Sequence, residues 1–201
     1  MKILLLFLTF LIPVFVYSQD NRYNIGKNNF AGGFSAASGN FDEGACVVFF
    51  MAGYERIVGS PEKNGYFFSG ELRARTGMLW ELMSDPKMSY SGKTAGLSIA
   101  VRPYLEIFEG NFLFLEGEFG YMYEYMTAKI TQSRITDKNS SGSIVPQYGV
   151  KLGDRAGKLS ISLGIYYFNH TRAVNRLIPR EYKIVDSREG LAGELGVSFY
   201  F

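Results

Sequence analysis

The sequence has only one cysteine among its 201 residues, and only one histidine and one tryptophan. A single cysteine excludes an intrachain disulfide and a metal cluster built from cysteines. Cys46 lies in the apolar run of residues 45–51, which favours a small buried or lipid-facing side chain over a reactive thiol. We therefore expect no metal and no cofactor.

The chain also lacks a strong charge of either sign, because its formal net charge is only +2. This balance gives no electrostatic case for nucleic-acid binding. Beyond the N-terminus, no apolar run has the length of a membrane-spanning helix. What the chain does contain is 23 glycines and 16% aromatic residues, most of them Tyr and Phe. This composition is typical of closely packed β-strands whose ends lie at a membrane interface.

The N-terminus has the layout of a secretory signal peptide. Lys2 precedes the apolar residues 3–16, and Tyr17 and Ser18 then lead into a polar run. A retained membrane anchor is the alternative, but the apolar run is shorter than the about 20 residues that span a bilayer as a helix. We predict that residues 1–18 are cleaved, which leaves one domain at 19–201.

The last stretch, residues 191–201, alternates strictly between two faces. One face is apolar and the other is small, polar or charged, with Glu194 in its middle. A period of two indicates a β-strand, because successive side chains point to opposite sides. The apolar face ends on Phe201. The apolar face comprises Leu191, Leu195, Val197, Phe199 and Phe201.

Seven earlier segments indicate strands, and six of them alternate clearly. The segment 45–56 is apolar on both faces at its centre, so its phase is not set by the sequence. After a short first loop, short turns alternate with longer connections. The expected strands are 30–38, 45–56, 66–78, 94–107, 112–126, 143–152 and 158–168; the turns are 60–65, 108–111 and 153–157; the long connections are 79–92, 127–142 and 169–189.

Eight strands are the smallest even number that closes a transmembrane barrel, and short turns alternating with long loops are typical of outer-membrane barrels. The sequence therefore predicts an all-β fold, an eight-stranded antiparallel up-and-down transmembrane β-barrel. An even strand number places both chain ends in the periplasm.

The charged residues of the strands share the polar faces, while the opposite faces are almost uncharged. A secreted lipocalin-like barrel would require the reverse, with an apolar interior. We predict that four acids and four bases meet in a filled lumen, where each needs a partner. A structural salt-bridge network is favoured over a proton relay, and the pair Glu116 and Glu118 could not act on a polysaccharide inside a filled barrel. The predicted network is Glu71, Arg73, Arg75, Arg102, Glu116, Glu118, Lys151 and Glu194.

Three stretches carry a resemblance to a known family. They are Val101-Arg-Pro-Tyr104, Phe112-Leu-Phe-Leu-Glu-Gly-Glu118 and the final Gly196-Val-Ser-Phe-Tyr-Phe201. The chain resembles the small eight-stranded outer-membrane β-barrels typified by OmpX and the OmpA transmembrane domain, within the porin superfamily. The resemblance implies an outer-membrane location, surrounding lipids and lipopolysaccharide, and a monomer. It also implies that the barrel-assembly machinery reads Val197, Phe199 and Phe201.

Members of this family are structural, adhesive or defensive surface proteins, and a few are enzymes. The lipid A deacylase pattern would require serine at position 172, two residues after His170, but this chain has Arg172 there. A small-solute pore is a third alternative, which a filled lumen disfavours. We expect recognition, if any, in the long connections. The last long connection, 169–189, is basic, with Arg172, Arg176, Arg180, Lys183 and Arg188. This charge fits an ordinary solvated loop, and it also fits a binding site for lipopolysaccharide or a surface partner.

Overall fold

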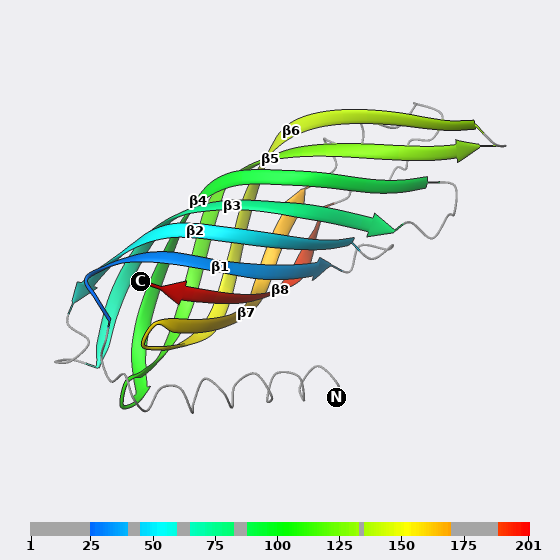
Figure 1. The fold of residues 1–201 in the computed structure, drawn as a ribbon. Helices are drawn as coiled ribbons and strands as arrows, with labels where there is room; N and C mark the ends of the chain where they lie inside the picture. The colour runs from blue at the N-terminus through cyan, green and yellow to red at the C-terminus, as the bar shows by residue number, and fades with distance from the viewer. Residues whose placement is uncertain (1–24, 40–44, 60–64, 83–87, 133–134, 170–188) are drawn as a thin grey trace, which may run out of the picture.

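Eight antiparallel strands close into a single barrel in the computed structural model, which describes residues 25–39, 45–59, 65–82, 88–132, 135–169 and 189–201. Each strand pairs with the next along the chain, and β1 pairs with β8 to close the ring (Figure 1). The predicted fold class is confirmed. The strands are β1 (Asn28–Gly39), β2 (Ala45–Gly59), β3 (Tyr66–Leu82), β4 (Met88–Phe108), β5 (Asn111–Gln132), β6 (Ile135–Ala156), β7 (Leu159–Asn169) and β8 (Glu189–Tyr200).

The alternation in the sequence becomes an inside and an outside. On β4, Leu97, Ile99 and Val101 are exposed, whereas Ser98 and Arg102 between and beside them are buried. The same holds on β3 and β5, so the predicted phase of these strands is confirmed. The apolar faces form the outer surface and the polar faces form the interior.

The interior is not uniform along the barrel axis. Near the tight turns it holds a layer of aromatic side chains, in which Phe67 stacks on Tyr104 with ring centroids 4.3 Å apart. Phe112 meets Phe67 edge-on at 5.1 Å. Charged residues from several strands lie beyond this layer. The aromatic layer therefore closes the turn end of the interior with apolar packing.

The tight turn between β4 and β5 lies at its predicted position, and the one between β6 and β7 is displaced. Gly110 has φ +80° in the turn between β4 and β5, as the predicted turn 108–111 requires. Gly157 has φ +55° between β6 and β7. Here the prediction of a turn over 153–157 is wrong by several residues, because β6 runs on to Ala156 and only Gly157 and Lys158 form the turn.

Two of the three predicted long loops are wrong over most of their length. β3 continues to Leu82 and β4 begins at Met88, which converts most of 79–92 into strand. β5 and β6 likewise absorb all but residues 133–134 of the predicted loop 127–142. Figure 1 shows the far ends of β4, β5 and β6 running well past those of β7 and β8.

The extensions of β5 and β6 escaped prediction because residues 127–142 are mostly polar, which removes the period-two signal. Backbone pairing does not depend on that signal. Thr127 still pairs with Ser140 across β5 and β6, and their hydroxyls lie 3.2 Å apart. Residues 170–188 of the third predicted loop lie outside the described residues, as does the predicted signal peptide 1–18. Within the described ranges, no helix is long and apolar enough to span a membrane.

Candidate functional site

Arg73 is the centre of an ionic network inside the barrel. It extends from β3 into the interior and is 2% exposed. Its guanidinium donates hydrogen bonds to Glu71 at 2.9 Å, to Glu116 at 3.0 Å and to Glu118 at 2.7 Å. Glu71 lies on the same strand, while Glu116 and Glu118 reach across from β5. One guanidinium therefore joins two strands that are not paired to each other.

Arg102, on β4, lies beside Arg73 and shares two of its carboxylates. Its Nε donates to Glu116 at 2.5 Å and its Nη2 donates to Glu71 at 2.5 Å. Its Nη1 donates to Glu55 of β2 at 3.1 Å. The two arginines can lie close together because four carboxylates surround them. Charge-assisted hydrogen bonds of this kind are among the strongest that side chains make.

A second group lies toward the projecting end of the barrel. Arg75 donates to Glu118 at 2.6 Å and to Glu194 of β8 at 3.3 Å. Lys151 of β6 donates to Glu194 at 2.9 Å and lies 3.2 Å from Glu116. The Arg75 guanidinium also lies over the Tyr166 ring, 5.0 Å from its centroid. This group connects the closing strand to β3, β5 and β6.

Two network residues were missed by the sequence analysis. Arg155 donates to Glu55 at 2.7 Å, and its guanidinium stacks 3.6 Å from the ring centroid of Tyr200. Glu55 was missed because the phase of β2 was not set by its apolar centre. Arg155 was missed because it was assigned to a turn, although it is in phase with Lys151 on the inward face of β6.

The structure brings all eight predicted network residues together in the interior, none more than 4% exposed. With Glu55 and Arg155 added, five carboxylates face five cations through direct ion pairs. Burying unpaired charges costs several kcal/mol each, so these ion pairs offset the cost of burying the ten network residues. An eight-stranded barrel has room for such side chains but not for a water channel as well.

The outer surface has the opposite chemistry. Large apolar side chains stand exposed around the barrel, such as Phe68, Leu72, Ile99 and Leu152, each more than half exposed. Tyr121, Tyr123 and Tyr125 follow one another on the outside of β5, on the projecting side. Soluble monomers rarely expose a continuous apolar surface of this extent. The surface therefore fits a hydrocarbon environment better than water.

The end of the chain completes the ring. The Phe201 backbone N–H donates to the Phe30 carbonyl at 2.8 Å, and the Phe30 N–H donates back at 3.1 Å. Val197 pairs with Phe34 of β1 in the same seam. The Phe201 ring itself is 75% exposed and Phe199 is 44% exposed. The predicted assembly signal thus presents its side chains on the outside, beside the β1 seam.

Other sequence-based alternatives concern residues outside this network. His170 and Arg172, on which the hydrolase alternative depends, lie outside the described residues. Among the described residues, no group of three or more His, Cys, Asp and Glu side chains could hold a metal ion. The side chains of the network form ion pairs with one another and fill the interior of the barrel.

Comparison with known proteins gave similarity only at the level of solved structures. No family model matches the chain, and no curated protein matches it. A major outer membrane protein of Thermus thermophilus is 12% identical, with 88% of this chain and 100% of that chain covered and a TM-score of 0.45. The attachment invasion locus protein Ail of Yersinia pestis is 11% identical, with 87% and 97% covered and a TM-score of 0.43.

Neisserial surface protein A is similar over the same extent, at 14% identity with 87% of this chain and 96% of that chain covered and a TM-score of 0.38. With identities of 11–14% and TM-scores below 0.5, these similarities carry no argument about the function of this chain.

Proposed function

We propose that this protein is an integral outer-membrane β-barrel whose interior is sealed and whose projecting strands serve a structural or surface-interaction role. The observation that carries the proposal is the division of the barrel wall into an exposed apolar outside and a charge-paired inside. A closed barrel can cross a membrane because every strand has a partner on each side. Lipids, including lipopolysaccharide in the outer leaflet, are its surroundings, and it acts as a monomer.

Membrane fractions washed with urea or carbonate should retain the protein, because its outer surface has no favourable contact with water. The retained protein should also migrate on gels as a compact species that heating converts to a slower one. Release into the soluble fraction by either wash would contradict the proposed location. Replacement of residues 1–18 with a known cleavable signal peptide tests the export prediction separately.

The surface-interaction role rests on the sheet formed by the outer parts of β3 to β6. β6 pairs with β5 from Ile135 onward, but its pairing with β7 begins only at Tyr148. Between these points, no described strand covers the free edge of β6. An open edge presents backbone N–H and C=O groups that a partner strand can pair with. This edge is where the proposal places recognition, together with the basic segment 169–189.

Shortening β5 and β6 together by removing residues 127–140 should leave a folded barrel, because the ion-paired interior begins further down the wall at Glu118 and Lys151. If the projecting sheet carries recognition, the shortened protein loses surface adhesion or serum survival while its gel mobility shift is kept. A matched deletion of residues 175–184 tests the basic segment. Unchanged adhesion and survival in both variants would leave a purely structural role.

The proposed assembly signal has its own test. Phe201→Ala removes an exposed ring that contributes about 1–3 kcal/mol at most, which is too little to unfold the finished barrel. The amount of folded protein in cells should nevertheless fall, since the closing strand has to be recognised before the ring closes. Refolding of the same variant in detergent should be near normal. A normal cellular yield would contradict the assembly role, and failed refolding would show that Phe201 is mainly structural.

A further inference from the structure

A row of small and β-branched residues crosses the outer face of the barrel. Each member pairs with the next across neighbouring strands, from β3 to β8. At Gly70 and at Gly117, an added Cβ would meet no atom within 4 Å, so the wall is hollowed at these points. The row is Gly70, Val101, Gly117, Val150, Ile165 and Gly193.

Large side chains flank this row on both sides. The next outward row toward the projecting end holds Leu72, Ile99, Phe119, Tyr148, Tyr167 and Leu191. The next row toward the turns includes Leu115, Leu152, Leu163 and Leu195, which pair in sequence. The small row is therefore the floor of a furrow one residue wide that runs across the strands.

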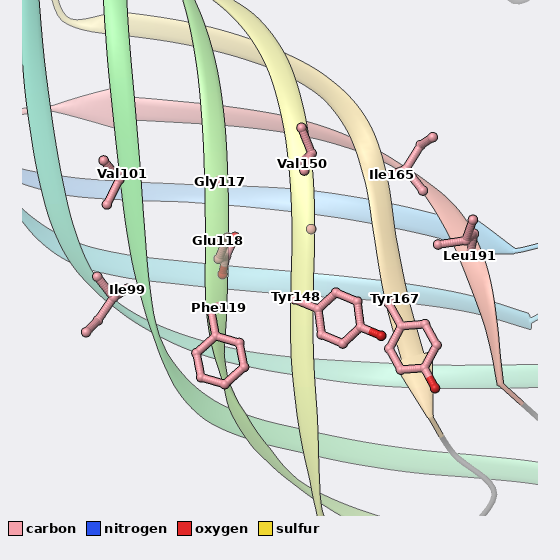
Figure 2. Close-up of a pocket in the computed structure, with 11 residues that line it drawn as sticks. Ile99, Val101, Gly117, Glu118, Phe119, Tyr148, Val150, Ile165, Tyr167 and Leu191 are labelled. Carbon is pink, nitrogen blue, oxygen red and sulfur yellow. The ribbon is translucent and has the colours of Figure 1, made fainter.

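Figure 2 shows the part of this furrow between β4 and β8, with Phe119, Tyr148 and Tyr167 standing along one wall. The hollow there covers the small row together with the row of larger side chains on its projecting side, and it has a volume of about 850 Å³. Tyr148 and Tyr167 stack with centroids 4.5 Å apart, which makes that wall continuous. Five interstrand spacings of about 4.8 Å give the whole furrow a length of about 24 Å.

The lining contains no charged side chain that faces outward. Glu118 borders the hollow but lies on the inward face of β5, where it pairs with Arg73 and Arg75. A long, narrow and apolar depression fits an extended hydrocarbon chain along its whole length. A second barrel would present a broad convex wall, which cannot follow a furrow one residue wide.

We propose that the furrow binds one acyl chain of a membrane phospholipid and holds it longer than the surrounding lipid. The inference rests on the proposed membrane location, because the furrow lies within the exposed apolar surface. A chain bound across β3 to β8 contacts six strands at once. It therefore fills the hollows at Gly70 and Gly117 that packing within the protein leaves open.

The test uses the full mature chain reconstituted into phosphatidylethanolamine vesicles with a trace of phosphatidylcholine that carries a diazirine on its acyl chain. After irradiation, adducts are mapped by mass spectrometry. Adducts should concentrate on the furrow residues Val101, Val150 and Ile165. Gly117→Leu should lower furrow labelling about tenfold, which corresponds to ~1.4 kcal/mol, because the new Cβ has open space around it and the side chain then occupies the furrow.

Ala74→Leu is the matched control, since Ala74 is exposed on the outside of β3 but outside the furrow. It should leave furrow labelling unchanged, while Gly70→Leu should reduce it as Gly117→Leu does. Even labelling over the whole outer surface would overturn the proposal. Failure of the unaltered protein to reconstitute would instead overturn the membrane location, on which the furrow proposal depends.

Discussion

Replacing Arg102 by alanine should destabilise the barrel by about 3–5 kcal/mol, the usual cost of breaking a buried ion pair by removing one partner. The loss is large because the change removes a hydrogen-bond donor from three carboxylates at once. Arg102 donates to Glu116, Glu71 and Glu55, all of which are buried. None of these groups can reach water to replace the lost donor. Urea unfolding of protein refolded in detergent measures the change.

Two variants make this prediction specific. Arg56→Ala removes an arginine that is exposed on the outside of β2, and its effect should be within about 0.5 kcal/mol. Combining Arg102→Ala with Glu116→Gln should recover part of the loss, because one uncompensated carboxylate is then neutral. Strictly additive losses in the double variant would show that Arg102 and Glu116 are not coupled.

Gly120→Ala should prevent most of the protein from folding, with an expected loss above about 4 kcal/mol. Gly120 faces inward on β5, and an added Cβ would overlap the backbone of the neighbouring strand, 2.6 Å from the Ser98 Cα. Backbone cannot rotate out of the way as the end of a side chain can. The overlap would therefore have to be relieved by separating β4 from β5.

Gly117→Ala is the control for this prediction, because it makes the same chemical change on the same strand. Its Cβ would point into open space on the outer face, and folding should be normal. The fraction of heat-modifiable protein in the membrane compares the two variants. Equal yields would show that the close approach of Gly120 to β4 does not limit folding.

Much of the barrel could be predicted from the sequence because an apolar outer surface and a filled, charged interior impose opposite chemistry on alternate residues. That contrast is strongest on β4, where Ile99 and Val101 alternate with Ser98 and Arg102. It made the strand count, the inward face and the eight network residues predictable. Arg73 and Arg102 could be assigned to the interior, but not to particular carboxylates, since partner choice depends on register and on side-chain reach across the barrel.

The parts that could not be predicted are those where the contrast disappears. Around Thr127 and Ser140 both faces of the sheet are polar, so strands that extend beyond the barrel look like loops. In β2 the apolar centre hides the phase, and Glu55 was not recognised as inward-facing. The furrow at Gly117 depends on cross-strand register, which brings together residues that are far apart in the sequence.

In the proposed arrangement, the wall of this barrel turns its apolar face to lipid and its charges to a closed interior. A nitroxide scan along the outward face of β4, with Cys46→Ser as background, tests it most directly. Labels placed one at a time at Leu97, Ile99, Val101 and Leu105 should collide with oxygen dissolved in the bilayer and not with a water-soluble nickel complex. Labels at these positions that collide with the nickel complex, or with neither reagent, would contradict the account.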